Sequence, residues 1–438
     1  MATYYANSGS GVDGNAGTSW AAATKTIKAA ATSASADGDI VIISASNVYY
    51  ETGINTTNHN VQYKSKAGEM AILDGDEASA NCFNMGNYSG TYYENLEIRN
   101  YGAIIWDNDA NADARKFSIS GCYVHDNTGV ITNRIMGDGG AQVGTFSGAS
   151  DHALIGECRF VRSEDNGAAN GASILIGGSH VLVRNTLFVG GPDPRNGVFL
   201  MQGHSYTNTT ASFVTCVATS SGFSTSGGGS KGAIQMGKVT NCIVSGGAPD
   251  NSGDGWIGIK SDHHQYNCIF VDGSSGKKII DTAGASASFS GSEISQNPLF
   301  ADASNLDFTL QASSPCTDAG TQPSAGTFTD MAEVGLSGNI RPGKDWIAYS
   351  TPAESNFGGD LTINLYSNAT VQYKRPATSG YSMGAYQRGG GYAGDLGKVD
   401  QVPFSLATKG VAGLRGRSIP YCVSRGGNPS IIIETGSV

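Results

Sequence analysis

Short apolar runs separated by turn residues recur along most of the chain. One kind of run begins with glycine and continues as a β-like stretch, as in residues 171–176, 197–201, 232–236 and 255–259. A turn follows, and then a second kind of run that usually opens with an Asn-Cys or similar pair. Helical periodicity is absent here, so the pattern predicts many short strands.

The second kind of run recurs at a spacing that predicts a solenoid. Five copies carry a cysteine, at Cys122, Cys158, Cys216, Cys242 and Cys268. With two copies that lack cysteine, the runs start at residues 95, 121, 157, 185, 215, 241 and 267. A period of about 26 to 30 residues fits three short strands and three turns per coil. We therefore expect an all-β, right-handed parallel β-helix.

The repeated cysteines have two interpretations. Equivalent positions of successive coils stack about 4.8 Å apart, which predicts an interior ladder of thiols acting as small hydrophobic groups. The alternative is a metal or redox site. None of the eight cysteines forms a CxxC pair or has zinc spacing. Thiols in register point the same way, which suits the torsion of a disulfide badly.

Both ends of the solenoid need a cap, because the end coils expose apolar core. Residues 1–38 are predicted to supply an N-terminal helical cap, with Thr18 and Ser19 as candidate N-cap residues. Residues 39–320 are the expected β-helix. The positions at helical spacing in the cap are Trp20, Ala23, Ile27, Ala30 and Ala34.

Beyond the repeats, residues 321–391 are predicted to form a C-terminal β region. It includes a hairpin of 361–366 and 370–374 that turns at 367–369. Residues 392–438 are interpreted as an assembly tail that ends in a short apolar strand. Such a strand needs the edge of a sheet to pair with, either on another subunit or on the β-helix of the same chain.

Composition narrows the function classes. Glycine accounts for 62 residues without a three-residue period, which excludes collagen and fits many turns. The net charge is −10 and no Lys/Arg cluster is present, so we expect no nucleic-acid partner. No run of 18 apolar residues predicts insertion into a membrane. No secretory signal is visible at the N-terminus, although a signal removed beforehand would leave the same sequence.

Two groups of motifs resemble pectate-lyase-like right-handed β-helix proteins. At the start these are Trp20, Gly38-Asp39-Ile40-Val41-Ile42, Tyr49-Tyr50-Glu51 and Ile72-Leu73-Asp74-Gly75. Toward the end they are Asn297-Pro298-Leu299-Phe300, Asp307-Phe308-Thr309-Leu310, Asp318-Ala319-Gly320, Arg341-Pro342 and Met383-Gly384-Ala385-Tyr386. The resemblance spans residues 1 to about 388 and implies the fold. It is weak for activity, because the superfamily includes lyases, hydrolases, adhesins and phage tail spikes.

One departure from that family concerns the closing motifs. The Arg-Pro and Gly-Ala-Tyr elements usually lie close together in the family, whereas about 40 residues separate them here. Polygalacturonases of this fold also carry Asn-Thr-Asp, Asp-Asp, Gly-His-Gly and Arg-Ile-Lys elements. The chain has only partial matches at Gly203-His204-Ser205 and Gly258-Ile259-Lys260.

Candidate site residues are therefore few. The catalytic candidates are His204 and a polar cluster in one turn, with an exposed loop as the alternative for the cluster: Lys260, Asp262, His263 and His264. Asp107, Asp109 and Asp113 are candidate Ca²⁺ ligands, with a solvated turn as the alternative. Tyr92, Tyr93 and Trp106 are candidates for stacking on sugar rings, with packing inside the solenoid as the alternative. No cofactor is demanded.

Two function classes remain. The first is a structural protein of a bacteriophage virion, such as a tail spike, head fibre or capsid decoration, that binds surface polysaccharide. It implies a homo-oligomer, most simply a trimer, contacts with other virion proteins, and synthesis in the host cytoplasm, where thiols stay reduced. The second is a secreted polysaccharide lyase or glycoside hydrolase.

Overall fold

A computed structural model of the chain describes most of the strands and both of the regions that flank them. Strands predominate, and the helices are short. The described residues are 2–76, 80–85, 88, 91–101, 103–107, 116–125, 134–138, 152–156, 158–161, 172–174, 180–190, 198–200, 209–218, 232–246, 257–261, 263–270, 279–280, 292–305, 307–321, 360–365, 369–374 and 382–385.

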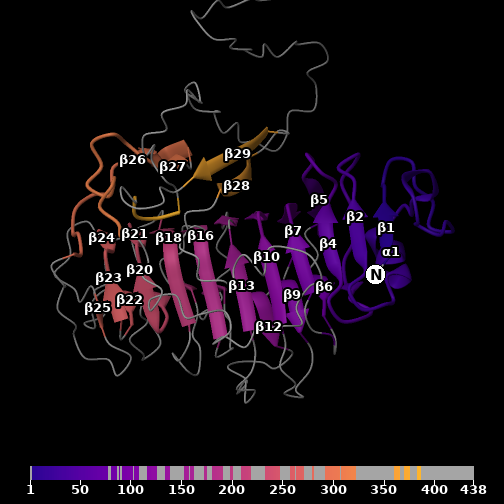
Figure 1. Ribbon diagram of the computed structural model, residues 1–438, viewed down its shortest axis with the longest axis horizontal. Coiled ribbons are helices and arrows are strands. Elements are labelled where there is room, and N and C mark those ends of the chain that lie inside the picture. The colour runs from indigo at the N-terminus through magenta and orange to yellow at the C-terminus, as the bar shows by residue number, and fades with distance from the viewer. Residues whose placement is uncertain are drawn as a thin grey trace, which may run out of the picture.

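The strands form a parallel β-helix (Figure 1). A typical coil, such as that of β7, β8 and β9, gives one strand to each of three sheets, and each strand pairs in parallel with its equivalent in the next coil. The predicted all-β solenoid is thereby confirmed. The first sheet contains β1 (Thr3–Ala6), β2 (Ile40–Ile43), β4 (Gln62–Ser65), β7 (Thr91–Glu94), β10 (Lys116–Ser120), β13 (His152–Gly156), the first halves of β16 (His180–Gly190) and β18 (Thr209–Ala218), β20 (Lys238–Thr240) and β23 (His263–Gln265).

The second and third sheets continue the same coils. The second contains β5 (Ala71–Asp74), β8 (Leu96–Arg99), β11 (Tyr123–His125), β14 (Arg159–Val161), the second halves of β16 and β18, β21 (Ile243–Ser245) and β24 (Cys268–Phe270). The third consists of two stretches, β3 (Ile54–Asn55), β6 (Asn81–Asn84), β9 (Ala103–Asp107) and β12 (Arg134–Asp138), then β15 (Ala172–Ile174), β17 (Val198–Leu200), β19 (Gly232–Gln235), β22 (Ile257–Lys260) and β25 (Ile279–Ile280).

A single left-handed residue turns the chain from the first sheet into the second. Asparagine and glycine adopt this conformation at low cost, and Asn95 (φ 56°) and Gly121 (φ 62°) hold it on adjacent coils. The corner recurs at Asn185, Phe213, Asn241 and Tyr266. Because side chains alternate across a strand, the corner fixes which residues of the second sheet face the interior and which face outward.

The interior is filled by a column of apolar residues, one from each coil of the second sheet. Phe160 and Phe188 stack within it, with ring centroids 5.0 Å apart and planes 8° apart. Every member is at most 3% exposed. The column runs through Leu73, Ile98, Val124, Phe160, Phe188, Cys216, Val244 and Ile269.

The predicted cysteine ladder is correct in burial and wrong in register. All seven described cysteines are buried and outside any disulfide. Cys122 and Cys158 do occupy equivalent positions on adjacent coils. Cys216, however, pairs with Val244, and Cys268 pairs with Ile243. The corner residue sets the register, and its spacing varies independently of the cysteines. Cys242 and Cys268 still lie on neighbouring coils, joined by a backbone hydrogen bond of 2.8 Å.

The N-terminal cap is built from two helices where one was expected. Ser19 caps the 3-10 helix η1 (Trp20–Ala22), and Thr26 caps α1 (Ile27–Ser33). The chain is extended between them, so the helical spacing from Trp20 to Ala34 is not one helix. Ile27, Ala30 and Ala31 on α1 belong to the main core and cover the first coils.

The region after the last coil packs back onto the outward face of the second sheet. We call residues 292–321 and 382–385 the closing segment. It includes the antiparallel pair β26 (Phe300–Asp302) and β27 (Asp307–Leu310) and the 3-10 helix η3 (Ala303–Asn305). Figure 1 shows β26 and β27 beside the second-sheet strands of the later coils. Phe308 and Ala385 join an outward cluster with Leu187, Val189 and Val217.

The predicted hairpin is confirmed, as β28 (Asp360–Leu365) and β29 (Ala369–Lys374) pair in antiparallel fashion. The proposed tail, residues 392–438, lies outside the described residues. In the described part of the chain, no helix is long and apolar enough to cross a membrane.

Candidate functional site

The polar cluster at the end of the β-helix is only partly described. Lys260 ends β22 in the third sheet, and His263 lies exposed on β23. His264 Nδ1 lies 2.7 Å from Glu293 Oε1, on the closing segment, and the Glu293 side chain is fully buried. This contact ties His264 to the end of the solenoid. His204 and Asp262 lie outside the described residues.

The aromatic candidates are a correction to the sequence analysis. Tyr93 is 0% exposed, and its ring stacks on Tyr63 of the preceding coil at 5.7 Å. Tyr92 is also buried. Buried rings cannot stack on a sugar, so packing within the solenoid is the correct interpretation of both. Trp106 lies on β9, and its side chain is outside the description.

The described residues do not bring the candidate calcium ligands together. Asp107 ends β9, and Asp109 and Asp113 lie outside the described residues. Within the described ranges, no group of three or more His, Cys, Asp or Glu side chains has the arrangement of a metal site.

A different set of polar residues gathers on the outward face of the second sheet. On β8, Leu96 and Ile98 belong to the core, so Glu97 and Arg99 between and after them point outward. Register places Tyr123 and His125 of β11 beside Glu97 and Arg99. The next coil adds Arg159 beside Tyr123, and the preceding coil adds Asp74 beside Arg99.

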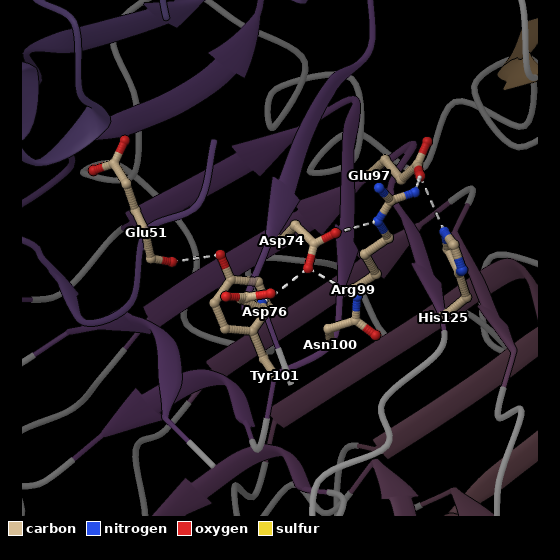
Figure 2. A network of polar contacts seen from close by, with 8 residues as sticks. All are labelled: Glu51, Asp74, Asp76, Glu97, Arg99, Asn100, Tyr101 and His125. Carbon is tan, nitrogen blue, oxygen red and sulfur yellow. Dashed lines mark hydrogen bonds and ion pairs between the residues drawn. The ribbon is translucent and has the colours of Figure 1, made fainter. Parts of the chain in front are cut away.

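Four of these side chains, Asp74, Glu97, Arg99 and His125, form one hydrogen-bonded network (Figure 2). Glu97 Oε1 lies 3.1 Å from His125 Nε2 and 3.2 Å from Arg99 Nη1. Arg99 Nε donates to Asp74 Oδ2 at 2.8 Å. Asn100 Nδ2 and the backbone N–H of Asp76 donate to Asp74 Oδ1 at 2.8 and 2.9 Å. One carboxylate thus bridges a guanidinium and an imidazole, and a second carboxylate orients the same guanidinium.

The environment of Asp74 keeps it ionised. Burial alone raises the pKa of this carboxyl group, but the hydrogen bonds from Asn100, Asp76 and Arg99 outweigh burial and hold the pKa below its usual value. Asp74 is therefore a fixed negative charge that positions Arg99, whose side chain is 28% exposed. It does not have the raised pKa that a general acid needs near neutral pH.

Tyr123 and Arg159 extend the network along the sheet. The Tyr123 ring lies over the His125 ring, with centroids 4.0 Å apart and planes 26° apart. The Arg159 guanidinium lies 5.3 Å from the Tyr123 ring centroid, a cation–π distance. We call Glu97, Arg99, Tyr123, His125 and Arg159 the outer network, and Asp74 its anchor.

The chemistry of the outer network suits an anionic sugar. Guanidinium groups bind carboxylates through paired hydrogen bonds. A hydrogen bond from His125 Nε2 to Glu97 makes Nδ1 the acceptor nitrogen of the neutral ring. Tyr123 adds a phenolic proton donor beside it.

The sequence analysis missed this network, although the sequence contains a signal for it. Positions two and four residues after the corners at Asn95 and Gly121 are Glu97, Arg99, Tyr123 and His125. The equivalent positions after the corner at Asn185 are the apolar Leu187 and Val189. Aligning the repeats on their corners, instead of on cysteine, would have revealed the change from charged to apolar.

Comparison with known proteins gives the fold alone. No protein-family model and no curated protein matches the chain. Among solved structures, pectate lyase Pel9A is 14% identical over 74% of this chain and 93% of its own, with a TM-score of 0.44. The GH136 lacto-N-biosidase from Eubacterium ramulus is 12% identical over 64% of this chain and 67% of its own, with a TM-score of 0.37.

Proposed function

We propose that the protein is a structural subunit of a bacteriophage virion that binds an acidic polysaccharide through the outer network. The binding role is supported by the charged residues that strand register brings together on the outward face of the second sheet. Charged groups of three successive coils meet there, whereas the same positions of the later coils, from Leu187 and Val189 to Cys268 and Phe270, carry no charge. Glu97, His125 and Arg159 are buried, and burying charges costs free energy, which favours a functional role for this charged group.

Arg99 is the group expected to hold the sugar carboxylate, because its side chain is 28% exposed. Glu97, Tyr123, His125 and Arg159 are between 4% and 8% exposed. Asp74 and Glu97 hold the Arg99 guanidinium at 2.8 and 3.2 Å, and His125 shares Glu97 with it. These buried groups would orient Arg99 toward the sugar.

The virion assignment has weaker and more general support. All seven described cysteines are buried thiols outside disulfides, as expected of a protein made and folded in a reducing cytoplasm. A host-encoded β-helix that acts outside the cell needs export, whereas virion proteins are released by lysis. The expected partners are further copies in a trimer and other virion proteins.

Cleavage of the polysaccharide is a second candidate, favoured by the contact between His125 and Glu97. In this proposal His125 removes the proton from the carbon next to the sugar carboxylate, while an arginine stabilises the developing negative charge. The bond from the ring to the glycosidic oxygen then breaks, and Tyr123 gives that oxygen a proton. The products are an unsaturated sugar and a new chain end, as in a lyase.

Binding is tested by titrating the full chain with polygalacturonate, alginate and a neutral glucan. We expect the acidic polymers to bind and Arg99→Gln to weaken binding at least tenfold. Lys66→Gln is the matched control, because it removes a cation from an exposed ion pair with Glu69 elsewhere on the first coils. Equal binding of all three polymers, or equal losses in both variants at unchanged thermal stability, would exclude the outer network as the site.

Cleavage and virion origin are tested separately. Absorbance of the unsaturated product should rise with wild-type protein and not with His125→Gln, whereas binding without any product leaves a binding protein alone. Genes for capsid, portal or tail proteins beside the gene for this chain, together with a trimeric mass in solution, would support the virion role. Neighbouring genes for sugar transport would favour the secreted enzyme instead.

A further inference from the structure

Two cysteine thiols meet where the closing segment contacts the last coil. Cys268 begins β24, in register with Ile243 of β21. Both belong to a buried cluster with Leu310, Cys316 and Met383 of the closing segment. The Cys268 thiol donates to Gln296 O at 3.3 Å, and the Cys316 side chain lies close enough to interact with it. Neither cysteine takes part in the outer network.

We infer that Cys268 and Cys316 are a modification site, a dithiol that a small-molecule disulfide oxidises to a disulfide fastening the closing segment to the β-helix. Each backbone is held in place independently of the thiols. The N–H of Cys268 donates to Cys242 O at 2.8 Å, and Cys316 O accepts from Met383 N at 3.0 Å. The pair is therefore presented by two anchored segments that approach each other only in the folded protein.

Strand register separates this pair from the other described thiols. Hydrogen bonding does not, because Cys268 Sγ donates to a backbone carbonyl, as do Cys158 Sγ, to Gly156 O at 3.1 Å, and Cys242 Sγ, to Thr240 O at 3.3 Å. Cys122 and Cys158 are the in-register pair, on adjacent parallel strands, where the side chains point the same way and the disulfide torsion is unfavourable. Cys268 and Cys316 do not lie on adjacent strands of one sheet, so this restriction does not apply to them.

The reaction is thiol–disulfide exchange. One thiolate attacks oxidised glutathione, forms a mixed disulfide and releases one glutathione thiol. The second cysteine then displaces the other glutathione. The two cysteines lose two protons and two electrons in total, and the reagent takes up the electrons to become two thiols.

Burial sets the rate of this exchange. The neighbouring Cys316 side chain and burial raise the pKa of the Cys268 thiol well above its usual value. Thiolate is the attacking species, so the docked closing segment protects the pair. Oxidation requires brief opening of the closing segment, and the new disulfide then prevents further opening.

The test uses the native full chain, incubated with oxidised glutathione and then alkylated. We expect a product lighter than the reduced protein by two hydrogens, with a peptide map that links Cys268 to Cys316. The oxidised protein should resist proteolysis of the closing segment and unfold several degrees higher. Cys316→Ser should show none of these changes, whereas Cys422→Ser, which alters the cysteine outside the described residues, should show all of them.

Three outcomes would overturn the inference. The pair could stay reduced in native protein and oxidise only after unfolding in urea. The map could link other cysteines. A stable glutathione adduct could persist on Cys268 or Cys316 without closing to the disulfide. Because the first measurement is made on wild-type protein, it does not depend on whether a variant folds, and it is independent of glycan binding.

Discussion

Replacing Asp74 by asparagine tests whether the outer network depends on a fixed charge. Asn100 Nδ2 and Asp76 N both donate to Oδ1, and Arg99 Nε donates to Oδ2. The amide of Asp74→Asn can keep Oδ1 in place, but its NH₂ group then faces the Arg99 N–H. One charge-assisted hydrogen bond is lost, and two donors are brought together.

The expected loss of stability is about 2–3 kcal/mol, because a hydrogen bond to a charged group contributes about 1.5–3 kcal/mol. It is less than the cost of about 3–5 kcal/mol for breaking a fully buried pair, since the Arg99 side chain is 28% exposed and water can solvate it. The free energy of unfolding is measured by urea titration at neutral pH. Asp302→Asn is the control, because it changes a carboxylate at the end of β26 that has only local hydrogen bonds.

The pH dependence gives a second and stricter test. The folded-state pKa of Asp74 is lowered, so its contribution is present above the unfolded pKa of about 3.9. The contribution is lost as pH falls through the folded pKa, because the unfolded chain binds the proton more readily. The stability gap between wild type and Asp74→Asn should therefore narrow in that window. A gap that stays constant down to about pH 2 would refute the assignment of Asp74 as an ionised anchor.

Three further changes test the fold. Phe188→Ala removes a fully buried ring from the interior stack and should cost about 3–5 kcal/mol in a denaturant titration. Gly121→Ala places a Cβ 2.3 Å from Asn95 Oδ1 at φ +62°, so it should unfold at lower temperature, and adding Asn95→Gly should recover the steric part of the loss. Gly384→Ala places a Cβ 2.5 Å from Thr215 Oγ1 at φ +82°. It should loosen the closing segment, seen as faster limited proteolysis with unchanged far-UV circular dichroism.

The fold was predictable from the sequence because its determinants are local. A corner made by one left-handed residue recurs at Asn95, Gly121, Asn185, Phe213, Asn241 and Tyr266, with short strands on either side of it. The register was not predictable from the cysteines, because different residue types adopt the corner conformation. Asn95, Gly121, Phe213 and Tyr266 all hold it, so no one letter marks the repeat. An alignment of the repeats on cysteine therefore places Cys216 and Cys268 in the wrong register.

The site was harder to predict because its contacts lie between coils. Asp74 and Arg99 are 25 positions apart and meet only because β5 and β8 are adjacent in the sheet. The burial of Tyr92 and Tyr93 was equally hard to predict from the sequence. A pair of aromatic residues at the start of a strand is compatible with either face. Only the closed shape of the coil places Tyr93 in the interior, stacked on Tyr63.

The outward face of the second sheet separates two functions along one surface. Strands β11 and β14 form the boundary, because Tyr123 and Val161 belong to the apolar cluster beneath the closing segment, and Tyr123 and Arg159 belong to the outer network. Cys268 lies four strands beyond β14, after β16, β18 and β21, or roughly 19 Å at the spacing of a sheet. Arg99, on β8, lies farther away still, and sites more than about 10 Å apart usually contribute additively. Fastening the closing segment should therefore leave glycan binding at Arg99 unchanged, and loss of binding in Arg99→Gln should leave the dithiol reaction unchanged. Coupling between the two would mean that Tyr123 transmits movement of the closing segment to Arg99, and the two functions would then not be separate.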